Sequence, residues 1–401
     1  MNPRLGALNP YPFERLRQLL AQADPASANL APISLSIGEP RHPAPQVVID
    51  AMRNAMDGLS AYPPTKGEPA LRAAIAGWIG RRYGIPAPDP ETQVLPVLGS
   101  REALFAVAQT LIDPLPGALV VCPNPFYQIY EGAALIAGAQ PWFINSSPEL
   151  NFGYDWAAVP PEVWRRTQLL FVCSPGNPAG NVLSLESWQT LFRLSDEYGF
   201  VIAADECYSE IYFDEASPPL GALQAAHQCG RGDLRNLLCF SSLSKRSNVP
   251  GMRSGFVAGD AALIRQFLLY RTYHGSAMSA VVSRASVAAW NDEDHVAENR
   301  RLYRRKFEAV YPILKPVLDV ALPDAGFYLW AGTPGNDEDF TRALHAATAV
   351  TVLPGSYLAR EAHNVNPGAG RIRIALVAPE RECVQAAQRM ADFLRQYTPP
   401  R

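Results

Sequence analysis

The stretch NLLCFSSLSKRSNVPGMRSGFVAGD, residues 236–260, places a lysine in a polar turn between two short apolar runs. The runs at 236–242 and 254–260 have the length of strands, and the turn holds Lys245 and, eight positions later, Arg253. Short runs that are apolar on both faces are typical of strands in a covered, mostly parallel sheet. The stretch therefore predicts an α/β sheet with a cationic turn at one of its edges.

The same pattern recurs upstream, which extends the predicted sheet. Apolar runs of strand length lie at 118–122, 168–173 and 200–205. The segment 183–200 between two of them has apolar residues at helical spacing and is interpreted as a crossover helix. The centre of the chain is therefore predicted to be α/β.

The pattern changes after about residue 285 to long helices and short strands. We expect helices at 294–318 and 380–396, with strands at 326–332 and 371–378. The first forty residues, rich in proline and without a strong period, are expected to pack on this part or on another subunit. The predicted division is an N-terminal arm with part of the small domain (1–45), a large domain (46–284) and a small α+β domain (285–401).

Composition excludes several classes of protein. With 35 Lys and Arg against 38 Asp and Glu, the net charge of −3 gives no support for a nucleic-acid or anionic-membrane surface. The chain shows neither a signal-peptide pattern nor an apolar run long enough to span a membrane, so a cytoplasmic protein acting on small molecules is expected. Six cysteines without a CxxC pair, and six histidines without metal-ligand spacing, predict neither disulfides nor a metal site.

Polar residues follow the predicted strands at the points where these end. Asn177 follows 168–173, Asp205 and Tyr208 follow the next strand, and Lys245 lies after 236–242. Ligands of open parallel sheets bind outside the carboxyl ends of the strands. Each residue alone has an ordinary reading as a turn, cap or surface charge, but together they indicate one shared ligand.

Four segments in this order and spacing carry a family resemblance: SPGNPAGNVLS (174–184), AADECYSEIYF (203–213), SSLSKRSNVPGMRSGFV (241–257) and RIRIALVAP (371–379). Across nearly the whole chain the sequence resembles the fold-type I, class I and II aminotransferases. No glycine-rich dinucleotide fingerprint or P-loop competes with this reading. The resemblance implies a large domain with a mostly parallel seven-stranded sheet between helices, a smaller α+β domain, and pyridoxal 5'-phosphate as cofactor.

The resemblance also implies roles at the reactive end of the cofactor. Lys245 would form the Schiff base with the cofactor aldehyde and later move the proton at Cα. Asp205 would hold the pyridine nitrogen protonated, so that the ring accepts electrons. Tyr208 and Asn177 would hydrogen-bond the 3-oxygen of the ring, and Tyr127 would lie on one of its faces.

A second group of residues would bind the cofactor phosphate. Arg253 and Ser242 are expected there, together with the hydroxyl of Ser100 and the backbone N–H groups of Ser100 and Arg101 at a helix start. Ser244 is expected to add a weaker contact. A guanidinium and a helix N-terminus both suit a dianionic group.

Arg373 and Gly38, together with Asn177, match the family pattern around the substrate, and Tyr62 matches it at the boundary between subunits. Arg373 resembles the arginine that pairs with the substrate α-carboxylate, although Arg371 would share its strand face if the strand is regular. Gly38 resembles the glycine whose backbone closes over that carboxylate. Tyr62 resembles a tyrosine that reaches the phosphate in the neighbouring subunit, which implies a homodimer with shared sites.

The expected reaction is transamination, with glutamate as the amino donor that the family normally uses. Within the family the chain looks most like the bacterial N-succinyldiaminopimelate aminotransferases of lysine and cell-wall precursor synthesis. An aspartate or broad-range aminotransferase is the alternative, and a lyase of the same fold shares the cofactor site. A cofactor-binding transcription regulator would need a basic N-terminal DNA-binding domain. Arg41 and Arg271 are candidates for the distal substrate group, but the sequence does not place them.

Overall fold

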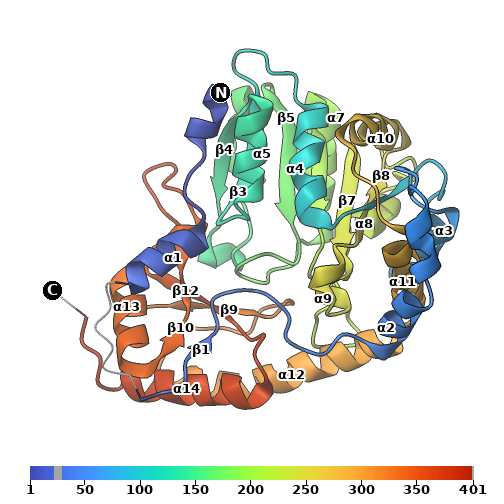
Figure 1. Cartoon of the computed structure of the whole chain (residues 1–401). Helices are drawn as coiled ribbons and strands as arrows, with labels where there is room; N and C mark the ends of the chain where they lie inside the picture. Colours follow the sequence, from blue (N-terminus) through green and yellow to red (C-terminus); the bar gives the residue numbers. More distant parts are fainter. Residues whose placement is uncertain (22–28, 400–401) are drawn as a thin grey trace.

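A seven-stranded sheet forms the centre of the computed structural model, which describes residues 1–21 and 29–399 (Figure 1). The strands lie in the order β2-β8-β7-β6-β5-β3-β4. Their bounds are β2 (Val94–Val97), β3 (Leu119–Asn124), β4 (Gln140–Asn145), β5 (Thr167–Cys173), β6 (Val201–Asp205), β7 (Leu237–Ser242) and β8 (Gly255–Gly259). The five strands predicted from apolar runs are all present, and β2 and β4 complete the sheet.

All neighbouring strands pair parallel except at β8, which is antiparallel to both β7 and β2. The predicted mostly parallel sheet is therefore confirmed. Because β5, β6 and β7 run in the same direction, Cys173, Asp205 and Ser242 all end their strands at one edge of the sheet. The polar residues that follow them meet there.

Helices cover both faces of this sheet. On one face α4 (Ser100–Leu111), α5 (Ile129–Ala137) and α10 (Ala261–His274) enclose a core that contains Val120 and Leu169. The opposite face buries the next residue of each strand, Val121 and Leu170, because side chains alternate along a strand. The remaining helices of this part are α2 (Gln46–Arg53), α3 (Pro69–Tyr83), α6 (Pro161–Trp164), α7 (Leu185–Tyr198), α8 (Ala222–Gln228), α9 (Leu243–Arg246) and α11 (Ala280–Asn291).

The lower part of Figure 1 holds two small sheets and long helices. A three-stranded antiparallel sheet has the order β11-β12-β9, and β1 pairs parallel with β10. The strands are β1 (Ile33–Ser34), β9 (Tyr328–Gly332), β10 (Val350–Thr351), β11 (Leu353–Pro354) and β12 (Arg371–Ala375). The helices are α12 (Asp294–Leu314), α13 (Asp337–Thr348) and α14 (Glu380–Leu394). Helices expected at 294–318 and 380–396 correspond to α12 and α14.

The N-terminal region packs on this second part. Helix α1 (Pro12–Leu20) buries Leu16 and Leu19 against Trp330, while β1 is hydrogen-bonded to β10. Between β1 and α2 the chain crosses from the small sheets to the right-hand side of Figure 1, where α2 lies beside α11. The residue boundaries proposed for the domains remain a prediction.

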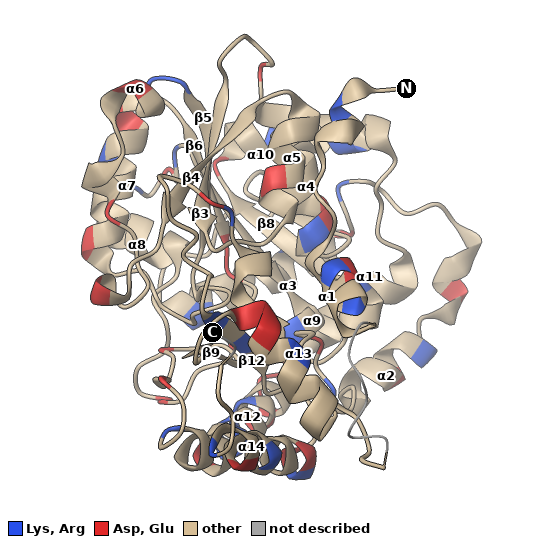
Figure 2. Cartoon of the chain, turned by 90° about the vertical axis from the view of Figure 1, so that its left-hand side faces the viewer, with Lys and Arg blue, Asp and Glu red and all other residues tan. Residues whose placement is uncertain are grey.

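Basic and acidic residues lie close together on some of the helices. Figure 2 shows basic and acidic residues interspersed, for example on α12 and α14, where Arg305 pairs with Glu380 at 2.9 Å. Across residues 1–21 and 29–399, no helix is both long and apolar enough to cross a bilayer. All six cysteines fall in the described ranges and are free thiols.

Candidate active site

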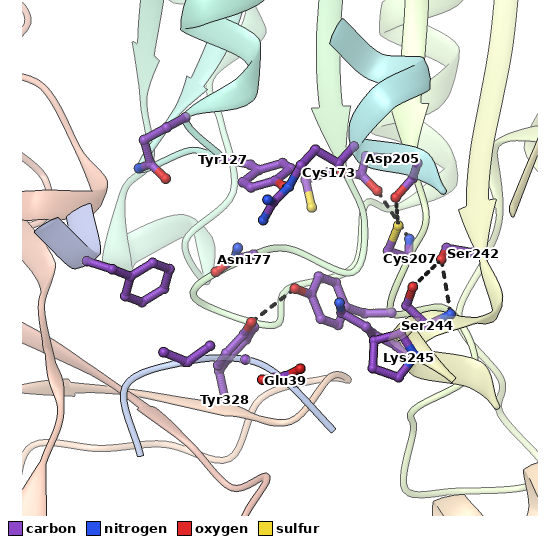
Figure 3. A pocket seen from close by; sticks show the side chains of 18 of the residues that line it. Glu39, Tyr127, Cys173, Asn177, Asp205, Cys207, Ser242, Ser244, Lys245 and Tyr328 are labelled. Carbon is purple, nitrogen blue, oxygen red and sulfur yellow. Dashed lines mark hydrogen bonds between the residues drawn. The ribbon is translucent and has the colours of Figure 1, made fainter. Parts of the chain in front are cut away.

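A cavity of about 700 Å³ lies at the carboxyl ends of β5, β6 and β7 (Figure 3). Its lining combines residues of the large sheet with residues of the small sheets and the N-terminal arm. Twelve of the thirteen predicted site residues line it: Gly38, Ser100, Arg101, Tyr127, Asn177, Asp205, Tyr208, Ser242, Ser244, Lys245, Arg253 and Arg373. The common edge at which β5, β6 and β7 end brings together Asn177, Asp205 and Lys245, and the other residues reach the cavity from other elements.

One end of the cavity is the start of α4, where Arg253 meets Gly99. Gly99 has a φ of +86°, and a Cβ at this position would lie 2.4 Å from a terminal nitrogen of Arg253. Only glycine lets the guanidinium approach the free N–H groups of the helix start so closely. Arg253 donates to the backbone oxygen of Pro250 at 3.0 Å, and Ser100 opens the helix. This combination of a cation and a helix N-terminus suits a phosphate.

The serines before Lys245 form the start of a helix of four residues, α9. Ser242 is its N-cap: the hydroxyl oxygen accepts from the N–H of Ser244 at 3.0 Å. The same hydroxyl donates to the Ser244 hydroxyl at 2.8 Å, as the dashed lines in Figure 3 show. This cap fixes the first turn of α9 and so directs Lys245 into the cavity.

Burial shifts the pKa values of two ionisable groups that line the cavity, Lys245 and Asp205. Burial lowers the pKa of the Lys245 amine; the Asp205 carboxylate acts in the opposite direction, and the guanidinium groups of Arg253 and Arg101 lower the pKa further, so that the net shift is downward. Burial raises the pKa of the Asp205 carboxyl, whereas hydrogen bonds from Cys207 and Tyr130 act in the opposite direction. The site therefore favours an unprotonated amine, and it calls for a cationic partner at the carboxylate.

Asp205 is held by donors on two sides. The Tyr130 hydroxyl donates to its Oδ2 at 2.7 Å, and the backbone N–H of Cys207 donates to Oδ1 at 3.3 Å. The thiol of Cys207 lies 2.9 Å from the Ser100 hydroxyl oxygen. These contacts orient the carboxylate toward the cavity.

Arg373 is a buried cation at the opposite end of the cavity, with 3% of its surface exposed. It donates to Asn177 Oδ1 at 2.9 Å and to the backbone oxygen of Ser36 at 2.8 Å, and its guanidinium lies 4.4 Å from the ring centre of Tyr328. Within the described residues it has no carboxylate partner, and its buried Nε has no acceptor. A buried, unpaired guanidinium is costly unless an anion binds there.

Tyr328 closes the space between Arg373 and Tyr208. The two tyrosine hydroxyls lie 3.0 Å apart (Figure 3), and burial raises the pKa of both. The Tyr328 oxygen occupies the place of a side chain at Gly38, because a Cβ there would lie 1.9 Å from it. Gly38 thus allows the N-terminal segment to pass directly over the cavity.

Tyr127 and Arg101 lie together on the side of the cavity next to α4. Arg101 Nε donates to the Tyr127 hydroxyl at 2.5 Å, and its guanidinium has no carboxylate partner among the residues that the structure describes. Tyr127 packs edge-on against Tyr130 at 5.8 Å between ring centres. The ring of Tyr127 and the Arg101 guanidinium, which has no carboxylate partner among the described residues, therefore border the same space.

Two residues considered in the sequence analysis, Tyr62 and Arg371, do not line the cavity. Tyr62 is fully exposed and does not line the cavity of this chain, so its role toward a neighbouring subunit stays a prediction. Arg371 lies against Phe152 and 3.8 Å from Asp319, outside the cavity lining, which separates it from Arg373.

The two candidates for a distal group do not line the cavity. Arg271 is buried and paired with Glu102, and Arg41 is exposed, 3.9 Å from Glu382. Sequence spacing did not reveal these ion pairs, because the partners are far apart in the chain. Neither residue therefore lines the cavity of this chain, and a role for either at the distal substrate group stays a prediction.

Three contributors were missed by the sequence reasoning: Tyr130, Cys207 and Tyr328. Tyr130 follows Tyr127 by three positions, which is one helical turn, so this spacing was a usable signal. Cys207 lies between Asp205 and Tyr208, and its position beside two site residues was a second signal. Tyr328 comes from β9, and only the packing of the two parts brings it to the site. No cluster of three or more potential metal ligands occurs in the described ranges.

Comparison with known proteins gives consistent results. The family model for aminotransferase class I and II matches residues 31–390. An LL-diaminopimelate aminotransferase of Desulforudis audaxviator is 32% identical over 98% of each chain. The solved structure of an aminotransferase from Neisseria meningitidis has a TM-score of 0.95 and 54% identity, covering 98% of this chain and 100% of that one. A probable N-succinyldiaminopimelate aminotransferase from Thermus thermophilus has a TM-score of 0.84 and 26% identity, with coverages of 95% and 99%.

Proposed function

This chain belongs to the class I and II aminotransferases, and from this premise we propose that its substrate pair is glutamate and the keto acid of N-succinyl-LL-2,6-diaminopimelate. Its cofactor is pyridoxal phosphate and its reaction is the transfer of an amino group between an amino acid and a keto acid. The observation that carries the assignment of the site is the buried Arg373 without a carboxylate partner, next to Lys245 and Asp205 in one cavity.

The phosphate of the cofactor is assigned to the start of α4. Arg253 approaches the free N–H groups there because residue 99 is glycine. The hydroxyls of Ser100 and Ser242 border the same end of the cavity, with Ser244 behind Ser242. A dianion there gains charge-assisted hydrogen bonds from the guanidinium and from the helix start.

The ring of the cofactor is assigned to the space between Asp205 and Tyr127. When bound, the cofactor supplies an electron sink for the electron pair left at Cα after proton removal. Asp205 would hold the pyridine nitrogen protonated, and that cation would lower the pKa of the carboxyl, which burial raises. Tyr208 and the Nδ2 group of Asn177 would be the donors to the 3-oxygen of the ring, since Asn177 Oδ1 accepts from Arg373.

Lys245 is assigned as the attachment point of the cofactor and as the base at Cα. Its side chain is partly buried, and burial lowers the pKa of its amine, so that the amine is unprotonated at neutral pH more readily than that of a surface lysine. The freed amine would take the proton from Cα of the amino donor in the first half-reaction and would give a proton to Cα of the new amino acid in the second.

Arg373 and Arg101 are assigned to the two ends of the substrate. Arg373 binds the α-carboxylate that both substrates share, and the backbone of Gly38 passes over it. Arg101 has no carboxylate partner among the described residues, which makes it the cation available for a distal carboxylate. A substrate with carboxylates at both ends fits these two cations.

A homodimer with shared sites completes the proposal. Tyr62 is fully exposed, and the neighbouring Met56 and Leu59 are more than half exposed. Apolar side chains gathered on one short segment favour a protein contact. The partner in this proposal is a second copy of the chain, with Tyr62 reaching the phosphate of that copy.

A second candidate substrate is unmodified LL-2,6-diaminopimelate, because relatives such as the 32% identical enzyme of Desulforudis audaxviator are named for it. The two substrates differ at the distal nitrogen, which is a free ammonium in one and a neutral amide in the other. The deciding experiment first loads the enzyme with the amino group of glutamate. It then compares single-turnover rates with the keto acids derived from the two compounds and with oxaloacetate.

A higher rate with the N-succinyl keto acid supports the proposal. A higher rate with the unmodified compound selects the second candidate, and one with oxaloacetate selects an aspartate aminotransferase. A further arm offers cysteine or cystathionine, which carry a sulfur leaving group; release of ammonia, thiol and keto acid there, with no amine transfer in the other arms, would assign the site to a lyase.

A further inference from the structure

The helix that carries Lys245 is too short to satisfy its own C-terminal end. An α-helix leaves its last carbonyl groups without partners in the helix, and α9 has four residues. The N–H of Ser247 pairs with the oxygen of Leu243 at 2.9 Å. The next carbonyl groups, including that of Lys245 itself, depend on donors from elsewhere.

Asn299, from the first turns of α12, supplies these donors. Its Nδ2 donates to the backbone oxygen of Lys245 at 3.1 Å and to that of Arg246 at 3.3 Å. Asn299 is 2% exposed, and Figure 1 shows α12 below α9. A side chain from a distant helix thus caps the short helix of the lysine.

The side-chain amide of Asn299 makes four hydrogen bonds, two through Nδ2 and two through Oδ1. Its Oδ1 accepts from Asn248 Nδ2 at 2.9 Å and from His42 Nδ1 at 2.8 Å. Two carbonyl groups on one side and a side-chain amide donor on the other fix the orientation of the Asn299 amide. His42 therefore carries its proton on Nδ1, because Oδ1 can only accept.

These four hydrogen bonds join three separate segments. Asn248 and Lys245 belong to the turn after β7, and His42 belongs to the segment between β1 and α2. That segment also provides the Ser36 oxygen that binds Arg373 and the Gly38 backbone that lines the cavity. One amide therefore ties the position of the lysine to the segment that supports the carboxylate-binding arginine.

We infer that Asn299 is a positioning residue, which fixes the backbone of Lys245 and thereby the place of its amine relative to the substrate. The inference rests on the proposed role of Lys245 as attachment point and base. A lysine side chain is long and flexible, so a fixed backbone is needed to hold its amine at Cα. The amide does this without touching the cofactor or the substrate.

The test compares Asn299→Asp with Asn299→Ala. Aspartate keeps the shape of asparagine but sets a carboxylate against the two carbonyl groups, whereas alanine only removes the contacts. A positioning role predicts that the aspartate variant is the more damaged. A role in packing alone predicts the reverse, because alanine leaves a cavity and aspartate does not.

Two measurements on the holoenzyme report positioning. The first is the pH midpoint of the visible absorbance of the bound cofactor, which we expect to differ from wild type in both variants. The second is steady-state kinetics with glutamate, where we expect kcat to fall on the order of 10- to 100-fold while KM changes by less than about threefold. An unchanged midpoint and kcat in both variants, with cofactor bound, would overturn the inference.

Val310→Ala is the matched control, because Val310 is buried in the same helix but makes none of the four bonds. It should lower the melting temperature and leave the absorbance midpoint and kcat unchanged. If neither Asn299 variant folds, Asn299→Gln decides, since it keeps the amide but moves it by one methylene group relative to the two carbonyl oxygens. A shifted midpoint then supports the inference, and an unchanged one refutes it.

Lys245→Ala separates this inference from the proposed function. If that variant keeps the visible absorbance of a covalently bound cofactor, the role of Lys245 fails, and the inference fails with it. If that absorbance is lost while the Asn299 variants match wild type, only the positioning role is refuted.

Discussion

Replacing Arg373 by lysine tests how the substrate α-carboxylate is bound. The guanidinium divides its donors between Asn177 Oδ1 at 2.9 Å and the Ser36 oxygen at 2.8 Å, and it stacks 4.4 Å from the ring centre of Tyr328. Lysine keeps the charge but has neither the planar fork nor the stacking face, so it cannot hold these acceptors and a carboxylate together. The variant thus loses the planar donor arrangement of the guanidinium but keeps a positive charge at position 373.

The expected loss is that of one charge-assisted hydrogen bond, roughly 1.5–3 kcal/mol, which corresponds to a fall in kcat/KM of about 10- to 150-fold. Both half-reactions contain the α-carboxylate, so both should lose by a similar factor. The assay is stopped-flow measurement of the cofactor absorbance, with glutamate in one direction and the keto acid in the other.

Arg371→Lys is the control, because Arg371 lies on the same strand outside the cavity lining and should change neither half-reaction. A loss confined to the acceptor half-reaction would mean that Arg373 binds the distal group instead. If the control loses as much as Arg373→Lys, the assignment of the α-carboxylate to Arg373 is refuted.

Four further changes test the rest of the site. Lys245→Ala should lose the visible absorbance of the attached cofactor and reduce turnover by several orders of magnitude; near-normal transamination would refute its role. Asp205→Ala should retain the fold but slow proton removal from glutamate at least about 100-fold, and an unchanged half-reaction rate would assign the electron-sink partner to another residue. Gly99→Ala should weaken cofactor binding, measured by equilibrium dialysis, because its Cβ would lie 2.4 Å from a terminal nitrogen of Arg253; equal affinity would contradict the phosphate assignment. Burial lowers the pKa of His42 in the folded protein, so the unfolded chain binds a proton on this imidazole at a higher pH than the folded chain does. The free energy of unfolding of the wild type, relative to that of His42→Gln, should therefore decrease as the pH falls from 7.5 to 5.5. Urea unfolding of both proteins measures this difference, and a difference that grows toward low pH would show the opposite sign.

The sequence predicted those site residues that follow strands of the large sheet. Asn177, Asp205 and Lys245 meet because parallel strands end at a common edge, and this edge can be recognised from apolar runs alone. The family resemblance added Gly38, for which no strand pattern was available, and it selected Arg373 over Arg371 on the strand predicted at 371–378. Gly38 and Arg373 both line the cavity.

The rest of the site depends on how the two parts of the chain are packed. Tyr328 and Asn299 reach it from β9 and α12, and local sequence contains no information on that packing. Arg271 was considered as a free cation, but its ion pair with Glu102 joins positions far apart in the chain. The periodic pattern of apolar residues does not predict ion pairs between side chains that are far apart in the chain.

The pairing of β1 with β10 sets a minimum time for completing the protein during synthesis. Ile33 lies opposite Val350, so the first strand of the small sheets leaves the ribosome more than 300 residues before its partner. At translation rates of about 5–20 residues per second, the delay is roughly 15–60 s. During this interval all seven strands of the large sheet are made, while Ile33 and Leu35, which become buried, lack the core they join. A nascent chain is therefore expected to acquire the phosphate end of its cavity well before the end that binds carboxylate.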